Sequence, residues 1–304
     1  MDFIQQVYRG KNDLWRYFLT IIIIMSPFIL NGIAYLLMPE LFEQAYENLE
    51  NYKGNKNLLL IQLLIPSVIL IGLLFLFVRF IHKRSILSLI TSRKEINWRR
   101  VFFAFFLWLI ISVLIIAIGI YLDNGQVVWN FKPGPFFVLL IISLTFIPIQ
   151  TSFEELFFRG YLMQGLGFLL KNRLIPLLLT SVLFGLMHGL NPEVNKLGWG
   201  VMVFYVGTGL LFGITTLMDN GTELALGMHA ANNIAAALFV TTSWGALQTD
   251  ALFLDTSEPT IGIDILLPVF VLYPIILLIF SKKYGWHSWR QRLLGRVEAT
   301  NFST

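Results

Sequence analysis

Three clusters of polar residues stand inside otherwise apolar stretches of this chain, and their side chains are of types that transfer protons. The clusters are Glu154, Glu155 and Arg159 in the first, His188 in the second, and His229 with Asn233 in the third. Ionisable groups are costly inside a membrane helix, so each cluster is a candidate for function. Together they hold a carboxylate base, two imidazoles and an amide that donates to a developing oxyanion. This set predicts hydrolysis by an activated water molecule.

The spacing in the first cluster separates its two acids. Glu155 and Arg159 are four residues apart and share a helix face, which favours a charge-assisted ion pair. Glu154 lies one residue earlier, about 100° around the helix, and points elsewhere. We therefore expect Glu155 and Arg159 to support the structure and Glu154 to act as the general base. The alternative is an interfacial cluster that marks the membrane surface.

The two histidines have structural alternatives as well. His188 follows Phe184 by four residues at the end of an apolar stretch, where an imidazole can hold a water molecule or simply cap carbonyl groups. His229 and Asn233 share a helix face and pair a proton carrier with an oxyanion donor. The alternative for this pair is a polar contact that holds two helices together.

A metal site is a second way to use the same side chains. Glu154, His188 and His229 are chemically adequate ligands for zinc, although no His-Glu-x-x-His motif is present. We expect no cofactor, with zinc at these three residues as the alternative. The chain has no cysteine, which excludes disulfides, thiolate zinc sites and a cysteine nucleophile.

The elements that position these residues are membrane helices. Hydrophobic residues make up 56% of the 304 residues and charged residues 13%, as is typical of a chain solvated by lipid. A spanning helix needs about 20 apolar residues. The qualifying stretches are Trp15–Met38, Leu58–Phe80, Val101–Leu122, Pro135–Phe158, Leu174–Leu190, Trp199–Met218, Leu224–Trp244 and Ile261–Phe280. The sequence predicts an all-α bundle of about eight spans, one integral membrane domain over residues 1–304, with a catalytic core at 135–240.

Lys and Arg gather in alternate connections, and cytoplasmic loops carry this excess. An even number of spans then places both termini in the cytoplasm. We expect the protein itself to lie in the inner membrane of a bacterial cell. The turn Asp219–Glu223 disagrees mildly, because it would be cytoplasmic without a positive charge. His82 and His287 lie in basic flanks and look like surface residues. Between spans, the segment Ile81–Trp98 is predicted as either an amphipathic interfacial helix or a solvated basic loop.

The net charge of +4 comes from basic residues beside apolar segments, not from a stripe along one surface. We therefore expect a lipid bilayer and a peptide or protein substrate as partners, and no nucleic acid.

In order, the motifs Glu-Glu-x-x-x-Arg, Phe-x-x-x-His and His-x-x-x-Asn on successive apolar helices resemble the CPBP family. Its members are CAAX proteases and bacteriocin-processing intramembrane glutamic endopeptidases, similar to type II CAAX prenyl proteases. The resemblance covers about Phe153–Ala236. It implies that Glu154 and His188 activate water without a metal, that His229 and Asn233 stabilise the oxyanion, and that Glu155 and Arg159 give support. The scissile carbonyl is expected near the cytoplasmic side.

Two other classes of protein fit the same residues. A non-catalytic immunity or scaffold protein of the membrane would use them to bind a peptide. A proton-coupled transporter also uses intramembrane Glu and His, but it predicts paired broken helices in two matching halves, which this chain lacks. Gly209 and Gly213 form a Gly-x-x-x-Gly pattern that fits close helix packing better than a broken helix.

Overall fold

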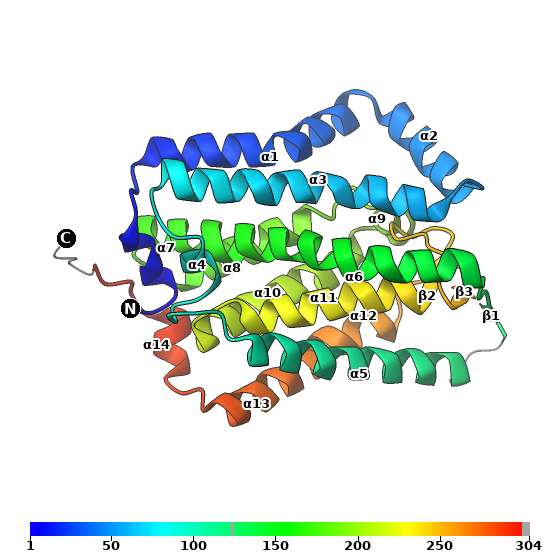
Figure 1. Cartoon of the computed structure of the whole chain (residues 1–304). Coiled ribbons are helices and arrows are strands. Elements are labelled where there is room, and N and C mark those ends of the chain that lie inside the picture. The colour runs from blue at the N-terminus through cyan, green and yellow to red at the C-terminus, as the bar shows by residue number, and fades with distance from the viewer. Residues whose placement is uncertain (123–124, 300–304) are drawn as a thin grey trace.

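The computed structural model describes residues 1–122 and 125–299, and long helices run back and forth between its two ends (Figure 1). The helices that make these passes are α1 (Leu14–Leu37), α3 (Lys56–Leu76), α5 (Trp98–Leu122), α6 (Pro133–Glu155), α8 (Leu174–Leu186), α10 (Met202–Asp219), α11 (Glu223–Leu238) and α13 (Tyr273–Tyr284). The shorter helices are α2 (Pro39–Glu50), α4 (Leu87–Ile90), α7 (Gln164–Leu170), α9 (Pro192–Leu197), α12 (Ile263–Leu267) and α14 (Trp289–Leu294). Turns of 3₁₀-helix cover Ile4–Arg9 and Trp199–Val201, and π-helical turns cover Phe77–Ile81, Leu156–Met163 and Pro268–Leu272.

The predicted all-α membrane fold is confirmed. Within the described residues, six helices are long and apolar enough to cross a membrane. One of them continues from Pro133 through the π-helical turn to Leu170, well past the predicted end at Phe158. The other two passes are shorter than the roughly 20 residues that a span needs. α8 has 13 residues and α11 has 16, so the number of eight spans stays a prediction.

A small sheet, which the sequence did not predict, lies at the end of the molecule away from both termini (Figure 1). Strand β3 (Phe253–Asp255) pairs with β1 (Val127–Trp129) antiparallel and with β2 (Val240–Thr242) parallel. Because β2 follows α11 directly, the sheet holds the connections around the ends of α5, α6 and α11.

The other end gathers both termini and the basic connections (Figure 1). Arg93 contacts Asp219 at 3.2 Å and Glu223 at 3.1 Å, and Arg100 also pairs with Asp219. The turn between α10 and α11 therefore receives its positive charge from a loop more than one hundred residues earlier. This contact removes the disagreement in the charge pattern, because both segments lie at the same end.

His82 and the segment around it differ from the prediction. His82 is only 1% exposed, because its Nδ1 donates to the carbonyl oxygen of Lys11 at 2.9 Å and its Nε2 lies 2.8 Å from the Tyr161 hydroxyl. Burial, with the charge of nearby Arg84, lowers the pKa of His82 to about 4. Leu89 is fully buried against Gly160. The segment is thus a connection anchored by buried residues up to Thr91 and exposed at Lys94 and Glu95, so it fits neither predicted form as a whole. His287 is exposed as predicted.

Candidate active site

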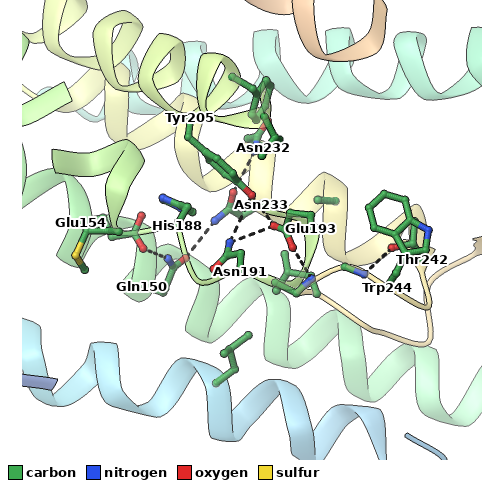
Figure 2. A pocket seen from close by; sticks show the side chains of 18 of the residues that line it. Gln150, Glu154, His188, Asn191, Glu193, Tyr205, Asn232, Asn233, Thr242 and Trp244 are labelled. Atoms are coloured by element: carbon green, nitrogen blue, oxygen red, sulfur yellow. Dashed lines mark hydrogen bonds between the residues drawn. The ribbon is translucent and has the colours of Figure 1, made fainter. Parts of the chain in front are cut away.

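A cavity of about 1080 Å³ lies among α1, α3, α6, α10 and α11. Gln150, Glu154, His188 and Asn233 line it, and further along it are Tyr205, Glu193 and the connection after β2. Figure 2 shows these side chains facing one another across the space. Lining residues such as Thr242, Gly245 and Glu258 belong to the end that carries the sheet. The cavity therefore extends away from the basic end, whereas we expected the reaction near the basic, cytoplasmic side.

Glu154 is at the last turn of α6, and its side chain is 19% exposed. Its Oε1 accepts a hydrogen bond from Gln150 Nε2, one helical turn earlier. Its Oε2 lies 3.6 Å from His229 Nε2, beyond hydrogen-bond distance, and has no hydrogen-bond partner among the described residues. One oxygen of this carboxylate is thus held in place, and the other is buried beside His229 without a hydrogen-bond partner among the described residues.

Glu155 and Arg159 form the predicted ion pair, and both side chains are fully buried. Glu155 Oε1 lies 3.1 Å from Arg159 Nη1, and Arg159 Nη2 donates to the carbonyl oxygen of Gly209 at 3.0 Å. The guanidinium also lies 4.5 Å above the ring of Phe184. Arg159 therefore connects α6 to α8 and α10 and neutralises Glu155. The separation between Glu154 and Glu155 that helical spacing predicts is present in the structure.

His229 bridges the two acids from behind the cavity. Its Nδ1 donates to Glu155 Oε1 at 2.8 Å, and its ring stacks on Phe212 with centroids 5.0 Å apart. The side chain is 4% exposed, and among the described residues that line the cavity His229 does not appear. A neutral imidazole that donates from Nδ1 carries its lone pair on Nε2, directed at Glu154. His229 is thus placed to share a proton with Glu154 but not to touch a substrate.

His188 lies just beyond α8 and lines the cavity beside Glu154 (Figure 2). Its Nδ1 donates to the carbonyl oxygen of Phe184 at 2.9 Å, so the capping contact weighed from the sequence is present. Its ring stacks on Tyr205, with centroids 4.3 Å apart and an angle of 18° between the planes. These two contacts hold the ring, and the neutral tautomer leaves Nε2 free for the cavity.

Asn233 lines the cavity and contacts two amides. Its Nδ2 donates to Gln150 Oε1 at 3.2 Å, and its Oδ1 accepts from Asn232 Nδ2 at 3.1 Å. Asn232 in turn accepts a hydrogen bond from Trp108 Nε1 at 3.2 Å. Sequence reasoning missed Gln150 and Trp108. Gln150 carries a weak signal, because it lies four residues before Glu154 on the same helix face; nothing local to Trp108 indicates its role.

A second missed group closes the cavity near the sheet. Glu193 Oε1 accepts hydrogen bonds from the Tyr205 hydroxyl at 2.5 Å and from Asn191 Nδ2 at 3.1 Å. Glu193 Oε2 accepts from the backbone N–H of Ala246 at 3.0 Å. Glu193 thus joins α9 to the connection between β2 and β3, and it holds the ring on which His188 stacks.

In the part of the chain that the structure describes, no group of three or more His, Asp or Glu side chains could hold a metal ion. Glu154 and His229 approach each other at 3.6 Å, and the ring of His188 stacks on Tyr205. The expectation of no cofactor and its zinc alternative both stay predictions.

Two of three comparisons with known proteins found a match. Residues 133–235 match the family model for the type II CAAX prenyl endopeptidase Rce1-like proteins. The chain is also 36% identical over 240 residues to an uncharacterized protein, YyaK, of Bacillus subtilis (strain 168), covering 76% of this chain and 80% of that protein. No solved structure matches. The matched residues contain the three polar clusters of the sequence, from Glu154 to Asn233, and the chain belongs to the type II CAAX prenyl endopeptidase Rce1-like family, a family of membrane proteases.

Proposed function

We propose that this chain is an intramembrane endopeptidase in which Glu154 activates the attacking water. One observation carries the proposal: Glu154 has one oxygen held by Gln150 and a second oxygen without a hydrogen-bond partner among the described residues, and it lines a cavity of about 1080 Å³. A carboxylate placed in this way accepts a proton from water as the water oxygen attacks the carbonyl carbon. The same proton then goes to the leaving nitrogen, and the peptide bond breaks.

From their positions, we assign different roles to the other polar groups of the site. His188 and Asn233 line the cavity, so we assign to them the contacts with substrate and water. Asn233 donates a hydrogen bond to the oxyanion, and His188, whose neutral ring presents a lone pair at Nε2, accepts a hydrogen bond from the attacking water. His229 lies behind Glu154 and is kept in one tautomer by Glu155, so it shares the proton with Glu154 during the reaction. We therefore assign His229 a supporting role, whereas the resemblance implies that it stabilises the oxyanion.

The substrate is a peptide or protein associated with the membrane, of the prenylated type or unrelated to it, and the membrane is the inner membrane of a bacterial cell. The apolar faces of α1 and α3 that line the cavity favour a substrate that enters from lipid. A scaffold or a proton-coupled transporter does not require a carboxylate with one oxygen bonded to an amide and the other without a hydrogen-bond partner among the described residues. We therefore favour the protease.

The deciding experiment compares peptide termini in membrane fractions of cells that carry the wild type, Glu154→Gln or Glu43→Gln. Glu43 is an exposed acid on α2 and serves as the matched control. We expect specific termini in the wild type and in Glu43→Gln, and a loss of at least about 100-fold in Glu154→Gln at an equal protein level, because the amide cannot accept the proton.

Identical termini in all three strains would overturn the proposal. The purified protein is then assayed with and without a chelator. Cleavage is expected to continue in the chelator, since the proposed base is the carboxylate itself, and a loss that zinc restores would replace glutamate activation by metal activation.

A further inference from the structure

Four hydrogen bonds connect α5 to Glu154 through three side-chain amides. Trp108 Nε1 donates to Asn232 Oδ1 at 3.2 Å, and Asn232 Nδ2 donates to Asn233 Oδ1 at 3.1 Å. Asn233 Nδ2 then donates to Gln150 Oε1 at 3.2 Å, and Gln150 Nε2 donates to Glu154 Oε1. Figure 2 shows Asn232, Asn233, Gln150 and Glu154 in this order along the cavity. Every bond runs in the same direction.

The direction follows from the chemistry at the first step. A side-chain amide can turn by 180° and exchange its oxygen for its nitrogen, so neighbouring amides fix one another only up to a common reversal. The indole of Trp108 has a donor and no acceptor. It therefore requires the oxygen of Asn232 to face it. Each following amide must then present an oxygen to the previous residue and a nitrogen to the next one.

The last step delivers an N–H to a carboxylate oxygen. If the chain were reversed, Gln150 would present its oxygen to Glu154 and repel the ionised form of a base. In the observed direction the donor from Gln150 holds Oε1 of Glu154, and Oε2, which is buried and has no hydrogen-bond partner among the described residues, lies 3.6 Å from His229 Nε2.

We propose that Trp108 and Gln150 are positioning residues for the reaction, and that the chain Trp108–Asn232–Asn233–Gln150 orients Glu154. Asn233 has two amide hydrogens, and the chain uses one of them. The second remains for the substrate oxyanion, so the same orientation serves the base and the oxyanion donor together. This inference rests on the proposed function, because it assigns Glu154 as the base.

The test uses purified full-length protein and a synthetic peptide that spans the bond found by the comparison of termini. Trp108→Phe removes the indole N–H and keeps an aromatic ring beside Tyr273, whose centroid lies 5.9 Å away. We expect kcat to fall about 10-fold with little change in KM, since the lost hydrogen bond joins Trp108 to the neutral amide of Asn232 and affects Glu154 only through the chain. Trp98→Phe, at an exposed position on the same helix, is the control and should match the wild type.

A double variant separates orientation from ordinary packing. Gln150→Met removes the last amide and should lower kcat by about 10-fold to 100-fold. If Trp108 acts only through the chain, adding Trp108→Phe to Gln150→Met should cause little further loss. Losses that multiply, or a loss that falls on KM and leaves kcat unchanged, would overturn the inference. An active Glu154→Gln enzyme would instead overturn the proposed function, so the two failures give different results.

Discussion

Two neighbouring acids of the same type have opposite environments in this protein. Glu155 is fully buried, paired with Arg159 and bonded to His229. Glu154 lines the cavity and keeps one oxygen unpartnered among the described residues. The difference follows from a rotation of about 100° between adjacent helical residues, which turns one side chain into the bundle and the other toward the cavity. Glu154 and Glu155 have the same chemistry, so the helix face on which each lies decides its role.

At this scale we predict that Glu155→Gln destabilises the protein strongly. The substitution leaves the Arg159 charge buried without its partner, which costs about 3–5 kcal/mol. The midpoint of thermal unfolding in detergent should fall by several degrees. Glu50→Gln breaks the largely exposed pair with Lys196 and should change stability by less than about 1 kcal/mol. Equal midpoints for the two variants would show that the buried pair contributes no more than the surface pair.

At the scale of the elements, α10 packs closely against α8 at a glycine. A Cβ placed on Gly209 would lie 2.8 Å from the backbone oxygen of Ser181, and the carbonyl of Gly209 also accepts the bond from Arg159. The predicted Gly-x-x-x-Gly contact is therefore present, with Gly213 packed beside Leu177. Phe212, on the same helix, stacks on the ring of His229, so a shift of α10 would move His229 in the site.

For this element we expect Gly209→Ala to reduce both stability and cleavage, because the backbone of α8 cannot give way as a flexible side chain can. A loss of about 1–3 kcal/mol is typical of such overpacking. Gly119→Ala on α5 is the matched control, since a Cβ there meets nothing within 4 Å. Unfolding midpoints and cleavage rates of the two variants check the prediction. Similar unfolding midpoints and cleavage rates for the two variants would mean that α10 can move away from α8 without loss of stability.

The whole molecule has two chemically different ends. One gathers both termini, the basic connections and the Arg93–Asp219–Glu223 cluster, and the other carries the sheet and the far part of the cavity. Because basic loops stay in the cytoplasm, the cavity should extend toward the opposite side of the membrane.

This arrangement predicts a labelling pattern. The chain has no cysteine, so single-cysteine variants start without background from this protein. Glu258→Cys at the cavity end should react with a membrane-impermeant maleimide on intact cells, whereas Lys94→Cys at the basic end should react only after permeabilisation. Both positions are exposed. The reverse pattern would place the termini outside and would contradict the charge rule for this chain.

The sequence by itself determined the properties that depend on local composition and helical spacing. It predicted an apolar bundle, the three polar clusters, and the pairing of Glu155 with Arg159, because hydrophobicity and residues four apart act over a few turns of one helix. Tertiary structure decided which groups meet across the bundle. It placed His229 behind Glu154, buried His82, set the direction of the cavity and brought Trp108 to Asn232, 124 residues later in the chain. Such contacts depend on how helices pack, and no local pattern contains that information.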